Sequence, residues 1–590
     1  MSVRSLPALC CLLLVIVASA LPASVLAARI HDIQGSGSTS PMTGARVKVE
    51  GLVTGNFIAG LGGFFLQEES RDEDGDPATS EAVFVFCTDY TEPLAVGDRV
   101  AVTGDVIEAE GMTALTRVTM DLIDRGNPLP GEAVIAHIVT ADMESLEAMR
   151  VRLPGPLTVV SNFNLQFGEI GISDRGVMVQ PTEVQPPGPG AYSLQQRQSA
   201  SVLILDDGNT ARNPDPIVYA TGGGPLRSTN TLRTGDRVQD ISGVLGFGFG
   251  AWRLQPTAPV TIVEANPRPV AQPAVGGNFR VAAFNVLNYF TTLDARGADT
   301  AAELARQRAR LARTLAGMNV DVIGLIEVEN DLAGVPDQAV IDIVNAVNAL
   351  GDPGTWAVVR TGAIGADQIK VALIYRQDRV APVGSYAVLD SQVDPGFDDT
   401  KNRPALAQTF VAVDTGEQVT LVVAHLKSKG SACAGDPDVR DGQGNCNRTR
   451  TEAAQALGAW ALADPTSSGD PDVLIMGDLN AYAREDPIVT LERMEYVNLA
   501  ARFAPHTYSY TFNGQRGSLD YGLANDSLAR QATGAAAWHI NADEPALLDY
   551  NLDNGRDRAL FDAELPYRTS DHDPLFMGFD LKSCDLPCPQ

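Results

Sequence analysis

The spacing of apolar residues changes once along this chain, and that change constrains the fold more than any other feature of the sequence. Before residue 265, apolar and polar residues alternate in short runs such as VKVEGLVT at 47–54 and RVAVTGDV at 99–106, which is typical of half-buried strands. After residue 278, strand-like runs alternate with segments of helical spacing. The sequence therefore predicts a multidomain protein, all-β at first and α/β afterwards.

Two β-modules are expected in the first half, at residues 28–140 and 145–264. LAVGDRVAVTGDV resembles LRTGDRVQDISGVL, and FFLQEESRDEDGDP resembles VLILDDGNTARNPDP at nearly the same offset, which indicates a possible duplication. Small modules with glycines between short strands are commonly OB-like barrels. The Pro/Gly-rich segment ANPRPVAQPAVGGN at 265–278 is the predicted linker.

The second half is predicted as one layered domain over residues 279–582. Helical spacing is found at 303–318 and 340–350. Strands are expected at 280–287, 320–328, 371–376, 419–426 and 472–480.

The first 27 residues have the features of a secretory signal peptide. Arg4 supplies the positive charge, the apolar run at 9–20 is too short to span a bilayer, and small residues lead to Ala27. Cleavage is expected after Ala27 or Ala28. We find no later apolar run long enough to span a bilayer, so we predict a secreted protein, extracellular or periplasmic, without stable membrane association.

Cysteine usage agrees with an oxidising compartment, in which some thiols should pair. Two of the seven cysteines leave with the signal peptide. Cys433 and Cys446 bracket a loop rich in Gly, Asp and Asn and are the favoured pair, while Cys584 and Cys588 could close a small loop near the carboxyl terminus. Cys87 is then left over. Spacing alone does not decide the connectivity.

Polar side chains follow the apolar strands of the second half, at the strand ends where α/β folds place active sites. Their types are carboxylates, amides and imidazoles, without thiolates, which suits Mg²⁺, or Mn²⁺ or Ca²⁺. The residues are Asn285, Glu327, His425, Asp478, Asn480, Asp520, Asp571 and His572.

In this order the motifs resemble the endonuclease/exonuclease/phosphatase (DNase-I-like) superfamily over residues 279–580. The matching motifs are AAFNVLN, DVIGLIEVEN, VVAHLKSKG, LIMGDLNAY, SLDYGLA and TSDHDP. The whole chain resembles the exported ExeM/NucH-type bacterial nucleases through GGFFLQEES, RPALAQTF and GDPD…GQGNCNRTRT. The resemblance implies a four-layered β-sandwich.

The resemblance also implies a role for each motif residue. Glu327 would hold the divalent metal, assisted by Asn285 and Asp571. Asp478 would orient or deprotonate the attacking water, and Asn480 would contact the phosphate. Oriented by Asp520, His572 would contact the scissile phosphate and supply charge or a proton. His425 would be an acid for the leaving 3′ oxygen, unless it only fills a strand end.

Four further residues are weaker candidates. Asp367 could orient His425 or be an ordinary turn carboxylate. Lys427, Lys429 and Arg448 flank the predicted site and could bind phosphates or solubilise a loop. An acidic turn, RDEDGDP at 71–77, lacks the full ligand pattern of a calcium loop.

We therefore predict a secreted, metal-dependent nuclease that hydrolyses phosphodiester bonds of DNA, or RNA as well; no protein partner is predicted. The alternatives are a phosphodiesterase acting on phospholipids or small phosphoesters, and an inactive extracellular binding protein. The formal net charge of −29 opposes tight nonspecific binding of a polyanion. A bound divalent cation would reverse part of that field locally.

Overall fold

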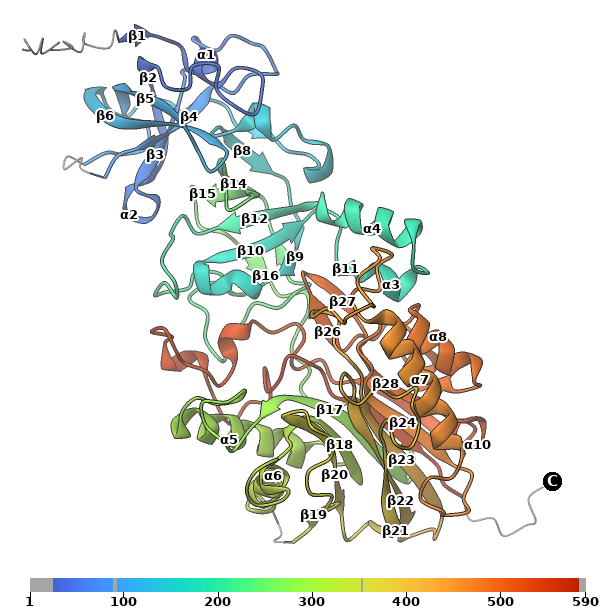
Figure 1. Cartoon of the computed structure of the whole chain (residues 1–590). Helices are drawn as coiled ribbons and strands as arrows, with labels where there is room; N and C mark the ends of the chain where they lie inside the picture. Colours follow the sequence, from blue (N-terminus) through green and yellow to red (C-terminus); the bar gives the residue numbers. More distant parts are fainter. Residues whose placement is uncertain (1–24, 89–92, 352–353, 583–590) are drawn as a thin grey trace, which may run out of the picture. The chain divides into compact units, whose positions relative to one another are not determined.

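Strand pairing gathers the described strands into five sheets (Figure 1). The structure, a computed structural model, describes residues 25–88, 93–351 and 354–582. Most of the predicted signal peptide, together with Cys584 and Cys588, lies outside these residues. The chain divides into two compact units, which are described separately: a barrel unit (residues up to 58, 62–131 and 144–149) and a main unit formed by the rest.

The barrel unit is a closed ring of five strands, β2, β3, β4, β6 and β5 in spatial order, in which β5 pairs back onto β2. The pairing of β4 with β6 is parallel and the other neighbours in the ring are antiparallel. Alternate residues point inward and form an apolar core that includes Val49, Phe64 and Val102. The elements are β1 (Leu26–Ala27), α1 (Ile30–Gln34), β2 (Arg46–Phe57), β3 (Gly63–Gln67), β4 (Ala82–Phe86), β5 (Arg99–Ala109) and β6 (Met112–Asp124).

The main unit begins with a β-module built on a sheet in which β9, β10, β12, β15, β14 and β8 follow one another. The first and last strands of this order, β9 and β8, are consecutive in the sequence and separated only by residues 154–156. The six strands therefore form a ring, as in the barrel unit. Its elements are β7 (Ala133–Val134), β8 (Arg150–Leu153), β9 (Leu157–Ser161), β10 (Glu169–Ser173), β11 (Met178–Val179), α3 (Pro181–Val184), α4 (Pro189–Ser199), β12 (Val202–Asp206), β13 (Arg237–Val238), β14 (Ile241–Gly248), β15 (Ala251–Pro256) and β16 (Ile262–Val263).

The two β-modules share a strand order. Of the two pairs of similar segments in the sequence, however, only one pair lies at equivalent positions in that order. If β8 and β9 count as one strand, the fourth strand of each ring pairs back onto the first, and the third pairs parallel with the fifth. The first GDRV motif leads into the fourth strand β5, and the second leads into the short strand β13, which directly precedes the fourth strand β14. FFLQ lies on the second strand of one ring and VLILD on the third strand of the other. The duplication stays a prediction.

The rest of the main unit contains two six-stranded sheets packed face to face. Their orders are β19-β20-β18-β17-β30-β29 and β21-β22-β23-β24-β28-β25. The strands are β17 (Phe279–Tyr289), β18 (Val322–Glu329), β19 (Trp356–Val358), β20 (Ile369–Arg376), β21 (Val380–Leu389), β22 (Arg403–Ala412), β23 (Gln418–His425), β24 (Val473–Asp478), β25 (Val497–Asn498), β28 (Asp520–Ala524), β29 (Ala532–Ala537) and β30 (Leu575–Phe579).

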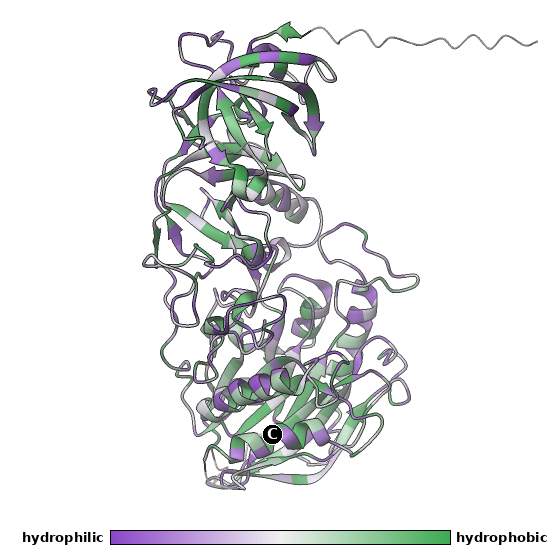
Figure 2. Cartoon of the chain, turned by 90° about the vertical axis from the view of Figure 1, so that its left-hand side faces the viewer, coloured by the Kyte–Doolittle hydropathy of each residue, from purple (hydrophilic) through white to green (hydrophobic). Residues whose placement is uncertain are grey.

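Helices cover the outer face of each sheet, which makes four layers (Figure 1). Residues of β17 alternate between two cores: Val281 lies between the sheets, whereas Phe284 packs against the core under α5 and α6. Figure 2 shows the strands of the layered domain coloured mainly as hydrophobic and its helices as mixed. The helices are α5 (Ala301–Gly317), α6 (Gln338–Asn348), α7 (Asn447–Leu462), α8 (Asp486–Arg493), α9 (Leu499–Phe503) and α10 (Asp526–Ala529).

The predicted elements of this domain are found with small shifts of their ends. Helical spacing at 303–318 corresponds to α5, which begins after a capping box formed by Thr300 and Glu303. The strands expected at 371–376 and 419–426 are β20 and β23. The expectation of a multidomain, mostly β protein with a layered carboxyl-terminal domain is confirmed. Among the described residues, no helix has the length and apolar character needed to cross a bilayer.

The β-module and the layered domain are joined by buried charge. Arg233 donates to Glu544 Oε1 at 2.6 Å and to Asp543 Oδ2 at 3.1 Å, and both carboxylates are at most 1% exposed. Arg268, in the predicted linker, donates to Glu544 Oε2 at 2.6 Å. A short strand pairing of β11 with β27 (Gln515–Gly517) adds backbone bonds between the same two parts. The segment at 265–278 is therefore part of the interface and not only a connection.

We expect Arg233→Met to lower the free energy of unfolding of the main unit by about 3–5 kcal/mol, because removing one partner of a buried ion pair leaves uncompensated charge. Urea unfolding followed by tryptophan fluorescence measures the change. Arg530→Met is the matched control: its pair with Asp526 is largely exposed, and the substitution should cost less than about 1 kcal/mol. If both variants lowered the free energy of unfolding equally, the buried ion pairs of Arg233 would not stabilise the protein more than an exposed pair does.

Candidate active site

Three of the predicted side chains stand next to one another on neighbouring strands of one sheet. His425 at the end of β23 pairs in register with Asp478 at the end of β24, and Asp478 pairs with Asp520 at the start of β28. In the opposite sheet, Asn285 on β17 pairs with Ile326, which precedes Glu327 on β18. Because the two sheets are stacked, these two rows meet at one edge of the sandwich.

The carboxylate of Asp478 is the point on which the cluster converges. Its Oδ2 accepts a hydrogen bond from Asn285 Nδ2 at 3.3 Å. The Nε2 atoms of His425 and His572 lie 3.7 and 3.9 Å from the same oxygen. Asp478 Oδ1 accepts the backbone N–H of Asn480 at 2.9 Å, which holds the carboxylate in place.

His572 is held from two sides. Its Nδ1 lies 2.7 Å from Asp520 Oδ2, so Asp520 orients the ring and leaves Nε2 facing Asp478. The ring of Tyr510 lies against the imidazole, with centroids 4.5 Å apart and planes tilted by 30°. Sequence reasoning did not find Tyr510, because a tyrosine in a short strand (β26, Tyr510–Phe512) has no motif of its own.

Glu327 and Asp571 offer the oxygen ligands of a cation site. Glu327 has a left-handed backbone with φ of 66°, and its Oε2 accepts the backbone N–H of Asn288 at 3.2 Å. Burial raises the pKa of Glu327, and the nearby Asp571 raises it further. One or two carboxylates, completed by substrate phosphate and several waters, form the ligand set with which proteins bind Mg²⁺. The donor set therefore fits a divalent cation.

The ionisable groups of the cluster have shifted pKa values with different causes. Burial, followed by the charge of Asp520, raises the pKa of Asp478 to about 7 although His572 opposes the shift. Burial alone would lower the pKa of His572, but Asp520 and Asp571 outweigh it and raise that pKa well above the usual range. Burial, with Arg403, lowers the pKa of His425. These shifts favour a protonated His572 and a neutral His425 around one carboxylate.

Asp367 does not touch His425 in the way the resemblance implied. Its carboxylate lies 3.2 Å from Arg403 Nε and 3.6 Å from Arg296 Nη1. Among the described residues, the buried Nδ1 of His425 has no hydrogen-bond partner. Arg403 pairs in register with His425 and is itself the partner of the Asp367 carboxylate. The ion pair that was expected between Asp367 and His425 is therefore replaced by one between Asp367 and Arg403. Arg403 is the first residue of the RPALAQTF motif, and its positive charge is the one feature of the sequence that could have marked it as a site residue.

The three cations predicted to bind substrate have different surroundings. Lys429 pairs with the buried Glu485 and lies 4.3 Å from the centre of the Tyr482 ring. Lys427 Nζ donates to the carbonyl of Ser428 at 2.9 Å. Arg448 has a side chain that is 67% exposed and a distant pair with Glu452 at 3.9 Å. Lys429 therefore neutralises a buried carboxylate, and Arg448 is the most accessible of the three.

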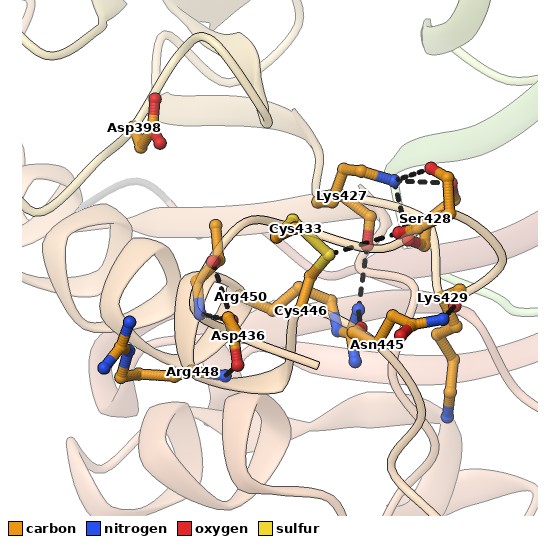
Figure 3. The surroundings of a disulfide bond; sticks show 12 residues. Asp398, Lys427, Ser428, Lys429, Cys433, Asp436, Asn445, Cys446, Arg448 and Arg450 are labelled. Atoms are coloured by element: carbon orange, nitrogen blue, oxygen red, sulfur yellow. Dashed lines mark hydrogen bonds between the residues drawn. A yellow bond between two sulfur atoms is a disulfide. The ribbon is translucent and has the colours of Figure 1, made fainter. Parts of the chain in front are cut away.

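A disulfide between Cys433 and Cys446 closes the loop beside these cations, as the sequence predicted (Figure 3). Arg450 is fully buried behind the loop and donates to the carbonyls of Asn445 at 2.7 Å, Gln443 at 2.8 Å and Lys427 at 3.1 Å. These bonds tie the disulfide loop to the segment that follows His425. Arg450 is therefore structural.

A cavity of about 320 Å³ adjoins the cluster within the main unit. Asp571, Tyr510 and Arg568 line it from the layered domain. Two phenyl rings also line it: Phe512 from the layered domain and Phe163 from the β-module. These rings are 53% and 72% exposed, so large apolar surfaces lie beside the carboxylates of the site.

Residues 282–573 match the model of the Endonuclease/Exonuclease/phosphatase family. This part of the chain is therefore similar to that family, whose enzymes are hydrolases and generally use divalent metal ions. Residues 141–265 match a family described as a domain of unknown function, DUF8508. No curated protein matched the chain.

Several solved structures resemble about half of the chain. A family member from Bacteroides thetaiotaomicron has 15% identity and a TM-score of 0.34, with 51% of this chain and 93% of that chain covered. A mannosyl-6-phosphatase from the same organism has 14% identity and a TM-score of 0.35, with 51% and 100% covered. TDP2 from D. rerio, complexed with single strand DNA product, has 15% identity and a TM-score of 0.34, with 51% and 99% covered.

Proposed function

We propose that this protein is an exported, divalent-metal-dependent nuclease of the ExeM/NucH type that hydrolyses phosphodiester bonds of DNA, with RNA as a second substrate. The observation that carries the proposal is the convergence of His425, His572 and Asn285 on the buried carboxylate of Asp478. Hydrolysis of a phosphodiester needs a group that directs water at phosphorus and donors for the charge that develops. This cluster contains both.

Each residue has one task in the proposed reaction. Asp478 orients the attacking water and accepts its proton, since its pKa of about 7 is close to that of an effective general base. His572, held by Asp520, binds a phosphate oxygen with its Nε2–H. His425, whose pKa is lowered by burial, donates a hydrogen bond from its Nε2–H to the departing 3′ oxygen, which takes its proton from solvent water. A divalent cation held by Glu327, Asp571 and Asn285 supplies, when bound, positive charge that polarises the phosphate.

His572→Ala should lower the rate of plasmid cleavage in Mg²⁺ about 10²–10⁴-fold, because positioned acid–base and charge-stabilising groups contribute this much. Conversion of supercoiled to nicked DNA on gels measures the rate, and EDTA should abolish it. His506→Ala, at an exposed position of the same domain, should leave the rate unchanged.

Substrate panels decide between the proposed function and its alternatives. Cleavage of plasmid DNA that is lost with EDTA and with His572→Ala supports the nuclease. Hydrolysis of sphingomyelin or of a small phosphomonoester without DNA cleavage would replace it by a phosphodiesterase or phosphatase. Failure to turn over any of these substrates with Mg²⁺, Mn²⁺ or Ca²⁺ would favour a binding protein.

The β-modules support a nucleic-acid substrate in the proposed function. A five-stranded ring in which the fourth strand returns to the first is the arrangement expected of an OB-like barrel, a fold that commonly binds single strands. Phe163 follows β9 and Phe512 ends β26, and both line the cavity beside Asp571. Exposed aromatic rings next to a phosphate site are suited to stacking of bases.

Replacing Phe163 and Phe512 together by Ala should raise the KM for single-stranded DNA about 5- to 100-fold and change kcat little, because base–aromatic stacking contributes about 1–3 kcal/mol per base. Steady-state cleavage of an oligonucleotide measures both constants. Phe249→Ala is the control, since this ring is 74% exposed but does not line the cavity. An unchanged KM in the double variant would exclude stacking at these rings.

Export is part of the same proposal. The disulfide of Cys433 and Cys446 supports an oxidising compartment, and residues 1–27 have the features of a signal peptide. We expect protein recovered from the culture medium to begin at Ala28 or Arg29. Amino-terminal sequencing measures this, and an intact Met1 on the recovered protein would contradict cleavage.

A further inference from the structure

A second cluster of metal-ligating side chains lies in the barrel unit. It consists of His31, Glu68 and Glu81, whose potential ligand atoms all lie within 4.8 Å of one another. His31 lies in α1, Glu68 follows β3 and Glu81 precedes β4. Gln67 and Ala82 are paired in the ladder, and the backbone N–H of Glu68 donates to the carbonyl of Glu81 at 2.9 Å. The two glutamates are therefore held side by side by the sheet.

One imidazole nitrogen contacts both carboxylates. His31 Nδ1 lies 3.2 Å from Glu68 Oε2 and 3.1 Å from Glu81 Oε2. A ring nitrogen carries at most one proton and directs it at one acceptor. Among the described residues, the buried Glu68 Oε2 has no hydrogen-bond partner, and Glu68 as a whole is 1% exposed. A proton on His31 therefore leaves one buried oxygen unsatisfied, which is costly.

The other oxygen of each carboxylate is fixed by the backbone. Glu68 Oε1 accepts the N–H of Ile30, and Glu81 Oε1 accepts the N–H of Asp74 at 3.2 Å. These bonds turn both Oε2 atoms toward Nδ1 of His31. Such outer bonds orient ligands in metal sites.

We propose that His31, Glu68 and Glu81 bind a divalent cation of which Zn²⁺ is the best match. Zinc bonds to nitrogen and carboxylate oxygen are about 2.0–2.2 Å long, so two ligand atoms of a tetrahedral zinc lie about 3.3–3.6 Å apart. The measured separations of 3.2 and 3.1 Å need little adjustment. Ca²⁺ and Mg²⁺ prefer oxygen ligands alone, so an imidazole in the site selects against them.

The cation has a structural role. It joins the short helix α1 to the adjacent ends of β3 and β4, and the side chain of His31 is 13% exposed, which leaves a route for the ion and a fourth ligand from solvent. This role is independent of the proposed nuclease reaction, because the cluster belongs to the barrel unit and Asp478 to the main unit.

Zinc binding by the full chain tests the proposal. The chain carries Glu327→Gln, which weakens the proposed cation site of the main unit, and is titrated calorimetrically with ZnCl₂. We expect one zinc per chain whose affinity falls at least tenfold in His31→Gln and in Glu81→Gln. Zinc should also raise the thermal midpoint of the barrel unit, whereas equal concentrations of Mg²⁺ or Ca²⁺ should not.

His137→Gln is the matched control, because His137 also contacts a carboxylate, Asp174 at 3.2 Å, but its side chain is 65% exposed. Glu81→Gln removes one of two adjacent buried carboxylates and should not unfold the metal-free barrel, which circular dichroism verifies. Absence of zinc binding, or equal affinity in all three variants, would overturn the proposal whatever the nuclease assays show.

Discussion

The apolar layer between the two six-stranded sheets determines where the polar residues of the site can lie. Val281, Leu421 and Met476 belong to this layer, and side chains alternate strictly between the two faces of a strand. A shift by one residue would turn each of them to the opposite face. The packing therefore sets the register of both sheets, and the register brings the strand ends that carry Glu327 and Asp478 to the same edge.

Buried negative charge is balanced in two ways in the main unit. Asp543 and Glu544 are surrounded by guanidinium groups, which lower their pKa values in spite of burial. Asp478 is surrounded by imidazoles and another carboxylate, so burial dominates and its pKa rises. The first arrangement joins two parts of the protein. The second creates a carboxylate that can exchange a proton near neutral pH, which supports the proposed hydrolysis.

Much of the layered domain could be predicted because its signals are local. The spacing of apolar residues predicts the strand that ends at His425. The same spacing, together with the capping residues Thr300 and Glu303, predicts the helix that follows Thr300. The partners that come from distant strands could not be predicted: Arg403 beside His425 and Tyr510 beside His572 meet their partners only through sheet register. The sequence predicted Lys429 to be a substrate contact or a solubilising charge. Its actual partner, Glu485, could not be predicted because it lies 56 residues further along the chain.

The sequence by itself predicted the class of chemistry, since carboxylates, amides and imidazoles follow several apolar strands, and it favoured the Cys433–Cys446 pair without deciding it. Tertiary structure decided which of these groups share an atom: Asp478 Oδ2 became the common neighbour of two histidines. It also gave His31, a residue without any motif, two carboxylate neighbours. The reason is that period and composition act over a few residues, whereas contacts between sheets depend on how buried apolar faces pack together.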